Sequence, residues 1–402
     1  MNLFKKLYAR TFEGVFRIML PLLPYKDPKT TEHIESVPQI LTENNKKKTL
    51  IVTDKMIASL DFSKTLFASL RGGNLPYEVY DSVVPNPTTK EVREALELYL
   101  ESGCDSIVAL GGGSALDCAK AVGARVARPK KSLSKMKGIL KVRKKIPLLI
   151  AIPTTAGTGS ETTLAAVICD EETRHKYAIN DFPLIPPYAV LDVATTASLP
   201  KHIVSTTGVD ALTHALEAYL GRSTTKKTRA DALKAIKLIF ENLPEAYEGG
   251  SEESRRNMLY AAHYAGRAFS KSYVGYVHAL AHALGGKYNT PHGLANAVLL
   301  VPVVKAYGKK VHKKLKKIAV FCGFVSPKCD KKAAAEILLK KLENLLAELD
   351  IPRTLPEIKE ADLNELVGYA YKEAYPLYPV PVLWNKAQLK EIYFKVMEQK
   401  TV

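Results

Sequence analysis

Cysteine is scarce in this sequence. There are five cysteines among 402 residues, they are scattered, and no two of them form a CxxC pair. Disulfide frameworks and structural zinc sites depend on closely spaced Cys or Cys and His ligands. We therefore expect neither of them, and we expect the chain to work in a reducing cytoplasm.

Long hydrophobic runs are also missing. Within the first 25 residues the longest uncharged stretch is 18–25, which is too short to span a bilayer, and no small-residue cleavage site follows it. The same segment predicts an amphipathic helix, because its apolar residues recur three to five positions apart. They are Leu3, Leu7, Phe12, Phe16 and Met19. We expect this helix to pack on its own fold or on a partner subunit, with a membrane surface as the alternative.

Acidic residues are too few to balance the basic ones, and the formal net charge is +17. Residues 128–145 contain nine basic side chains and no acidic one. Such a run attracts anions, which include nucleic acid, lipid headgroups, acidic substrates and phosphate-bearing cofactors. No nucleic-acid-binding module or aromatic stacking pattern accompanies the charge, so we expect a solvated surface and no nucleic-acid partner.

The length and the pattern of the chain predict two domains. Short apolar runs that read as buried parallel strands alternate with helical stretches at 89–102 and 114–127, which indicates a doubly wound α/β sheet. The predicted strands are 49–54, 106–113, 147–155 and 189–192. After residue 200 the pattern is helical throughout. We predict an N-terminal helical extension at 1–30, a Rossmann-like α/β domain at 31–198 and an all-helical domain at 199–402, with the cleft between the two domains as the ligand site.

Three glycines stand between a predicted strand and a predicted helix. Gly111, Gly112 and Gly113 precede Ser114, and glycine allows close approach of a ligand to the free N–H groups at a helix N-terminus. This arrangement predicts a pyrophosphate cradle, although the spacing is not GxGxxG and a tight turn is the structural alternative.

Two more features lie at predicted strand ends, where doubly wound sheets bind ligands. Asp54 could accept hydrogen bonds from a ribose and would repel a 2′-phosphate, which favours NAD(H) over NADP(H); it could equally cap a helix. Residues 153–163 contain six hydroxyl side chains and two glycines, and could line the nicotinamide half of a cofactor.

Metal-binding side chains are concentrated in the helical half. Asp210 and His214 are four residues apart, as are His278 and His282, and His292 follows soon after. Residues four apart share one face of a helix, and imidazoles with one carboxylate suit Fe²⁺ or Zn²⁺. Spacing alone does not choose the ligands. Position 279 is Ala, which excludes HExxH protease chemistry.

The order of "GGGSALDCAK", "PTTAGTGSETT", "TTGVDALTHALEAY" and "GYVHALAHALGGKYNTPHG" resembles the iron-containing (group III) alcohol dehydrogenase family over roughly residues 48–395. The resemblance implies a dehydroquinate synthase-like two-domain fold. It also implies metal ligands at Asp210, His214, His278 and His292, with His282 in the substrate cleft. We expect His282, or a water that it holds, to pass the released proton toward solvent. The residues that it assigns to the cofactor are Asp54, Asn86, Gly112, Gly113, Ser114, Asp117, Thr154, Thr155, Thr163 and Lys176.

The implied activity is reversible hydride transfer between an alcohol and NAD(H), yielding an aldehyde or ketone, with Fe²⁺ or Zn²⁺ as a Lewis acid on the substrate oxygen. A glycerol dehydrogenase-type or dehydroquinate synthase-type enzyme is the nearest alternative, and a basic nucleic-acid or membrane-surface binder is a distant one. We expect a homodimer or larger homo-oligomer without an integral membrane segment.

Overall fold

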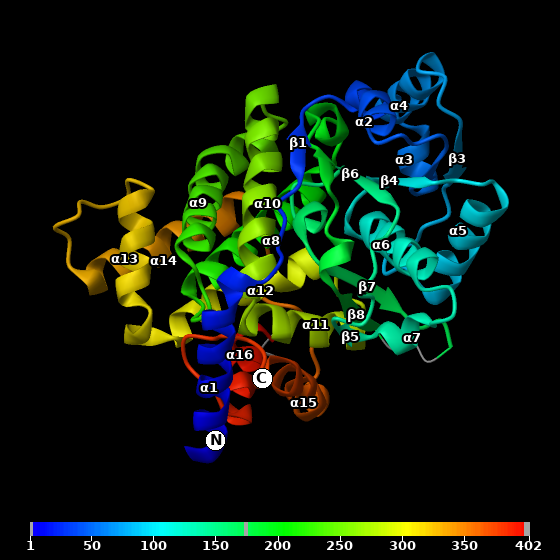
Figure 1. Ribbon diagram of the computed structural model, residues 1–402. Helices are drawn as coiled ribbons and strands as arrows, with labels where there is room; N and C mark the ends of the chain where they lie inside the picture. Colours follow the sequence, from blue (N-terminus) through cyan, green and yellow to red (C-terminus); the bar gives the residue numbers. More distant parts are fainter. Residues whose placement is uncertain (1–2, 173–175, 398–402) are drawn as a thin grey trace. The chain divides into compact units, whose positions relative to one another are not determined.

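The computed structural model describes residues 3–172 and 176–397, which form two compact units. One unit runs from Pro24 to Leu199 and contains the sheets. The other consists of helices and combines the N-terminal segment up to Leu23 with the chain from Pro200 onward (Figure 1). None of the described helices combines the length and the apolar character that a transmembrane segment requires.

The sheet unit is built on six parallel strands in the order β1-β9-β6-β4-β2-β3. The strands are β1 (Lys29–Thr31), β2 (Thr49–Val52), β3 (Tyr77–Tyr80), β4 (Ser106–Gly111), β6 (Leu148–Pro153) and β9 (Tyr188–Val190). Sequence periodicity predicted β2, β4, β6 and β9 near these bounds. The short edge strands β1 and β3 were not predicted, since each is only three or four residues long and carries polar side chains.

Helices cover both faces of this sheet, which explains why its central strands are apolar on both sides. Ile51, Val108 and Ile150 belong to the hydrophobic core beneath α2 (Val37–Glu43) and α4 (Asp61–Gly72). Alternate residues of the same strands belong to a second core beneath α5 (Thr89–Glu101) and α6 (Gly113–Ala127); they include Leu50, Val52, Ile107, Ala109, Leu149 and Ala151. The two cores fix the register of β2, β4 and β6, and their carboxyl ends therefore lie along one edge.

A second, smaller sheet belongs to the same unit. It contains β5 (Gly138–Ile139), β8 (Lys176–Asn180) and β7 (Ala165–Cys169), and β7 pairs antiparallel with β8. The remaining helices of the unit are short: α3 (Lys55–Ser59) and α7 (Leu133–Met136).

The helical unit contains α1 (Leu3–Met19) and nine further helices (Figure 1). These are α8 (Lys201–Leu220), α9 (Lys226–Tyr247), α10 (Glu252–Ser272), α11 (Tyr276–Tyr288), α12 (His292–Ala306), α13 (His312–Phe321), α14 (Lys331–Glu348), α15 (Leu363–Ala374) and α16 (Lys386–Val396). Every residue of α8 from Gly208 to Leu220 is buried, so α8 is the central helix of the unit. Its polar residues are therefore held in a protected interior.

Candidate active site

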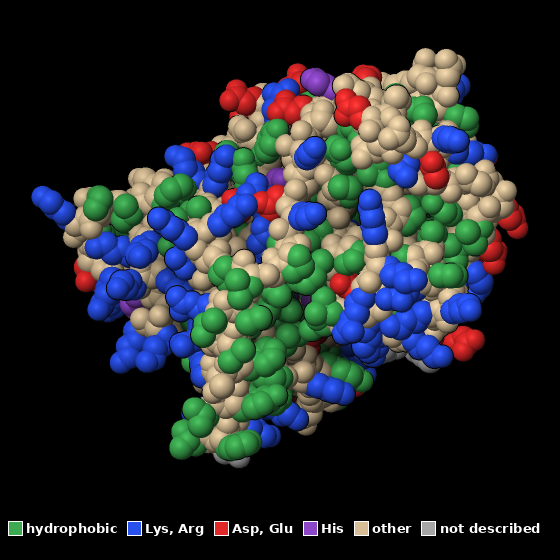
Figure 2. Space-filling model, viewed as in Figure 1, with side chains coloured by type: hydrophobic (Ala, Val, Ile, Leu, Met, Phe, Trp, Pro, Cys, Tyr) green, Lys and Arg blue, Asp and Glu red, His purple; other side chains and the backbone are tan. Residues whose placement is uncertain are grey.

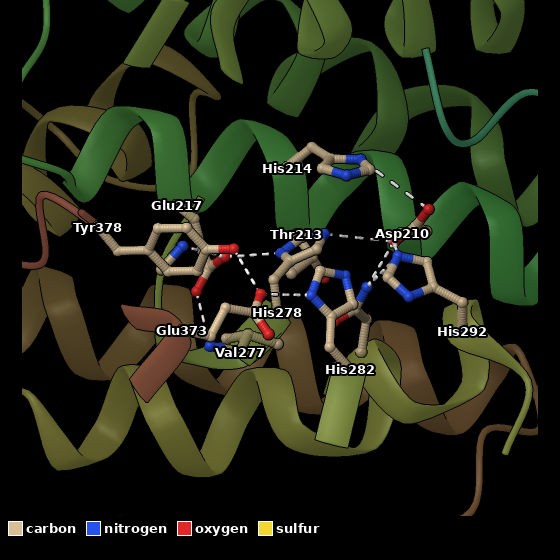
Figure 3. A network of polar contacts seen from close by, with 12 residues as sticks. Asp210, Thr213, His214, Glu217, Val277, His278, His282, His292, Glu373 and Tyr378 are labelled. Carbon is tan, nitrogen blue, oxygen red and sulfur yellow. Dashed lines mark hydrogen bonds and ion pairs between the residues drawn. The ribbon is translucent and has the colours of Figure 1, made fainter. Parts of the chain in front are cut away.

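Three helices of the helical unit bring acidic and imidazole side chains together. Asp210 and His214 lie one turn apart on α8, His278 lies in the first turn of α11, and His292 is the first residue of α12 (Figure 3). One ligand atom from each of these residues lies within 4.8 Å of all the others. The structure thus brings together the four residues that the resemblance implied as ligands.

The spacing of these atoms suits a single metal ion. Asp210 Oδ1 is 3.5 Å from His292 Nε2 and 3.8 Å from His278 Nε2, and Asp210 Oδ2 is 3.9 Å from His214 Nδ1. Two atoms that bind one ion at about 2.0–2.2 Å lie at most about 4.4 Å apart. The four residues therefore need only small side-chain adjustments to bind one cation.

The protonation of His278 provides a test of that fit. Its Nε2 atom is buried and has no hydrogen-bond partner among the described residues. Burial, together with the charges of His214 and His292, holds the pKa of His278 well below its usual range, so the ring is neutral. A buried, neutral imidazole nitrogen without a hydrogen-bond partner is what a metal ligand requires.

Glu217 fixes the orientation of the His278 ring. Its carboxylate accepts hydrogen bonds from the N–H groups of Gly275 and Val277 and from His278 Nδ1, each at 2.7 Å. Because the Nδ1 proton is used in this bond, the lone pair of His278 is on Nε2, and such carboxylate–histidine pairs are typical of metal sites. Burial raises the pKa of Glu217 to about 7 despite these hydrogen bonds.

Glycine is required at position 275 for this contact. A Cβ atom there would lie 2.6 Å from Glu217 Oε1, which is closer than real Cβ contacts occur. The sequence analysis did not identify Glu217. The signal was present, however, because positions 210, 214 and 217 follow the spacing of one helix face.

His282 occupies a different place from the four clustered residues. Its side chain is about as exposed as that of His292, its ring stacks on His292 with centroids 5.2 Å apart, and its Nδ1 lies 2.6 Å from Glu373 Oε1. Tyr378 donates its hydroxyl to the same oxygen at 2.5 Å. Burial pushes the pKa of Glu373 upward, but the charge of His282 and these hydrogen bonds bring it below its ordinary value. His282 therefore begins a polar chain that continues through Glu373 to Tyr378 (Figure 3).

Asn296 is a further residue of this site that sequence reasoning missed. Its side-chain nitrogen lies 2.7 Å from Asp210 Oδ1 and 3.1 Å from His292 Nε2. It stands four residues after His292 on α12, so helix spacing could have indicated it. Its amide holds the carboxylate and the ring near each other.

A second group of possible ligands, in the sheet unit, is less suited to a metal. His33, Glu35 and Asp192 have ligand atoms close to one another. Both oxygens of Asp192, however, already accept backbone hydrogen bonds, from Ile34 at 2.8 Å and from Ala194 at 2.9 Å. This carboxylate shapes the local backbone instead.

The glycine loop lies where β4 ends and α6 begins, at the carboxyl edge of the sheet. Gly111 has φ +154°, and a Cβ atom there would lie 2.7 Å from the Cβ of Ala115, so only glycine fits. No side chain caps the N-terminus of α6, whose N-cap residue is Gly112. At Gly113 a Cβ atom would approach Thr158 Cγ2 to 3.0 Å. An uncapped helix N-terminus beside glycines is suited to bind a phosphate group.

Three of the residues implied for the cofactor meet beside this loop. The backbone N–H of Asn86 donates to Ser114 Oγ at 3.3 Å, and Lys176 Nζ donates to Asn86 Oδ1 at 2.7 Å. Asn86 has a φ of +58°. The lysine adds a positive charge near the helix N-terminus, where an anion would bind.

Other residues of that set make structural hydrogen bonds. Asp54 caps α3 by accepting from the N–H of Ile57 at 2.9 Å, which is the capping alternative that the sequence left open. Asp117 accepts from Ser160 Oγ at 2.9 Å and from the N–H of Val167 at 3.1 Å. These contacts tie Asp54 and Asp117 to the surrounding backbone and side chains of the sheet unit.

The hydroxyl-rich loop is anchored by Lys120, which sequence reasoning also missed. This fully buried ammonium group donates to Ser160, to Thr163 and to the carbonyl of Ala165, and burial lowers its pKa to about 8. Thr163 therefore faces Lys120. Elsewhere in the loop, the backbone N–H of Thr154 donates to the carbonyl of Gly111 at 3.1 Å, and Thr155 is the nearest side chain to Gly112.

Comparison with known families assigns the chain. The profile of iron-containing alcohol dehydrogenase matches residues 30–193, and that of the Fe-containing alcohol dehydrogenase family, C-terminal, matches residues 204–397. The chain belongs to the iron-containing alcohol dehydrogenase family. As a member of this family it is an oxidoreductase that acts on CH–OH groups, and its four clustered residues are placed to hold a metal ion.

Several dehydrogenases are similar to the chain over most of their length. It is 38% identical to 1,3-propanediol dehydrogenase of Citrobacter freundii over 354 residues, which is 86% of this chain and 90% of the relative. It is 35% identical to NAD-dependent methanol dehydrogenase of Bacillus methanolicus, over 85% of this chain and 90% of the relative. The crystal structure of a 1,3-propanediol oxidoreductase matches with a TM-score of 0.89 and 32% identity, over 92% of this chain and 99% of that one.

Proposed function

We propose that this enzyme interconverts a small primary alcohol and its aldehyde, with Asp210, His214, His278 and His292 holding Fe²⁺ or Zn²⁺. The observation that supports this assignment most strongly is the approach of their four ligand atoms to within 4.8 Å of one another. A cation bound there supplies a Lewis acid that polarises the alcohol oxygen. The names of the similar 1,3-propanediol and methanol dehydrogenases support a short, primary alcohol as the substrate.

We propose that the glycine loop and its neighbours bind NAD(H). Gly112, Gly113 and Ser114 would present backbone N–H groups of α6 to the pyrophosphate, and Lys176 would add its charge. Asp54, Asn86, Asp117, Thr154, Thr155 and Thr163 complete the proposed cofactor set. Their hydrogen bonds within the sheet unit suggest that Asp117 and Thr163 act by shaping the loop.

The proton released on alcohol oxidation would leave through His282. Its Nδ1 is held by Glu373, so its Nε2 is the atom that would take the proton, and the carboxylate of Glu373 would stabilise the resulting imidazolium. Tyr378 keeps that carboxylate in place through its own hydrogen bond. His282 therefore carries a proton without binding the metal.

Metal-depleted protein would test the proposal when it is reconstituted separately with Fe²⁺ and with Zn²⁺. NADH formation would be followed by its absorbance, with methanol, ethanol, 1,3-propanediol and glycerol as substrates. We expect activity to return with a stoichiometric metal and to be higher with NAD⁺ than with NADP⁺. Metal binding without oxidation of any primary alcohol would contradict the proposed substrate class.

A reducing compartment such as the cytoplasm suits the protein. All five cysteines are free thiols, and burial raises the pKa of Cys118 and Cys322 above the ordinary value. Thiols of this kind are poorly reactive and stable where glutathione is reduced. Fractionation of the source cells would test this localisation.

A further inference from the structure

Helix α1 is attached to the helical unit by its polar side. Arg10 binds Glu13 and donates to the carbonyls of Val380 at 2.8 Å and Pro381 at 3.2 Å. Glu13 is only 3% exposed, and Arg222 Nε lies 3.4 Å from its carboxylate. These hydrogen bonds and ion pairs hold α1 in one orientation on the unit.

The opposite side of α1 is apolar and faces solvent. An α-helix turns about 100° per residue, so the chain positions can be placed around its axis. All five charged residues of α1 fall on one half of the circumference, and the other half contains no charge. We call the exposed apolar residues of that second half the apolar arc; they are Leu3, Phe4, Leu7, Val15, Ile18 and Met19.

The exposure of the apolar arc is too large for an ordinary protein surface. Leu3 is 82% exposed, Ile18 is 73% exposed, and Leu22, which follows in the same segment, is 74% exposed. Figure 2 shows hydrophobic side chains, in green, gathered over the helix that Figure 1 labels α1. A contiguous apolar surface of this kind marks a binding site for a protein or a membrane. The sequence analysis expected a docked amphipathic helix, and the helix is docked, but with its apolar side outward.

Positive charge surrounds the arc. Lys5 lies beside one edge of the apolar half, and Arg17 lies beside the other. Arg17 is also near basic residues of the helical unit. Burial lowers the pKa of Lys314 to about 8, and the charges of nearby arginines, including Arg222 and Arg17, contribute to this shift.

The charge of the whole helical unit favours an anionic occupant. Residues 1–23 and 200–402 contain 35 Lys and Arg against 21 Asp and Glu, whereas residues 24–199 contain 23 against 20. Pairing two copies through the arc would bring two strongly basic units together, which costs electrostatic energy. An anionic lipid surface would instead attract the unit and accept the apolar side chains.

We propose that α1 is a membrane-surface anchor, whose apolar arc enters the headgroup and acyl boundary of an anionic bilayer while its charged side stays on the protein. The helix is about 25 Å long at 1.5 Å per residue, long enough to lie in the plane of the interface. The enzyme would then be held peripherally at the bilayer surface. This inference is independent of the proposed function.

Flotation of the full-length protein with vesicles tests the proposal. We expect it to float with vesicles of phosphatidylcholine plus phosphatidylglycerol, less with phosphatidylcholine alone, and less as salt is raised. The double variant Leu7→Glu/Ile18→Glu should lose at least about tenfold in vesicle affinity, because two exposed apolar side chains that would enter the bilayer are replaced by anions. It should keep the alcohol dehydrogenase activity of the unaltered protein.

The matched control is Leu100→Glu/Ile337→Glu, which changes two exposed apolar residues outside α1 by the same charge. It should float like the unaltered protein. Equal losses in the two variants would show that net charge alone drives binding and would overturn the proposal. A second outcome would also overturn the proposal. If neither protein bound vesicles, and light scattering showed the unaltered protein as a dimer and the α1 variant as a monomer, the apolar arc would bind a second copy of the chain instead of a membrane.

Discussion

The two candidate ligand sites are built in opposite ways. In the helical unit, side chains on α8, α11 and α12 provide every proposed ligand atom. A hydrogen bond from His278 to Glu217 and one from Asn296 to Asp210 orient them. In the sheet unit, the binding surface at the start of α6 is backbone, and its side chains mainly hold the loop in shape. A site made of side chains should lose its ligand when one functional group is removed. A site made of backbone should lose its ligand when a side chain is added that blocks the N–H groups.

Removing a proposed metal ligand should have the largest effect. Asp210→Ala deletes the carboxylate around which the three imidazoles are arranged, so we expect loss of bound metal and a fall in kcat/KM of at least about a thousandfold. Elemental analysis of the purified variant and the NADH assay would measure both. NADH affinity, measured by fluorescence, should be unchanged. His263→Ala, a buried histidine outside the cluster, is the control and should keep its metal.

Replacing His282 should lower turnover without removing the metal. We expect His282→Ala to reduce kcat by about a hundredfold, because a positioned proton carrier contributes this much or more. The pH dependence of kcat should also change, and added imidazole should restore part of the rate. A loss of metal from this variant would contradict the proton-transfer role and would place His282 among the ligands.

Adding atoms at the glycine loop should give the converse result. Gly113→Val adds a Cβ atom that would lie 3.0 Å from Thr158 Cγ2. The two methyl groups of the valine would enter the space beside the helix N-terminus. We expect NADH affinity to fall by about tenfold to a hundredfold while metal content remains full. An unchanged affinity would show that the cofactor phosphates bind elsewhere.

The smallest effect is expected at Asp54, where capping and cofactor binding can be separated. Asn is also a good N-cap, so Asp54→Asn should keep the thermal stability but weaken the preference for NAD⁺ over NADP⁺ by a few-fold, as it removes a negative charge. Asp54→Ala should lose the hydrogen bond to Ile57 and destabilise the fold by about 1 kcal/mol. Thermal unfolding and paired kinetics with both cofactors would measure these changes.

Much of the fold could be predicted because its strongest patterns are local. The buried strands β2, β4 and β6 are apolar on both sides, and the helices after residue 200 are long and periodic. Strands such as β3 could not be predicted, because they are short and depend on pairing with distant neighbours. The same holds for the orientation of α1, since amphipathic spacing shows that two faces differ but not which one packs.

The candidate metal site divides in a similar way. Residue type and family resemblance were enough to propose Asp210, His214, His278 and His292 as ligands. Helix spacing could also have indicated Glu217 and Asn296, but it was not used for them. No sequence pattern could indicate Glu373, because it is 91 residues from His282 in the chain. Contacts between distant residues are set by tertiary packing, and a single sequence carries no direct record of them.

The carboxylate of Glu217 also caps the N-terminus of α11. It accepts hydrogen bonds from N–H groups that a capping residue in the chain would ordinarily satisfy. Folding of the two helices against each other thus aims the His278 ring before any ion arrives. An enzyme with such a prearranged socket can give up its cation and be reloaded without refolding. The activity of the enzyme in the cell would then depend on the concentration of free metal as well as on the rate at which new chains are made.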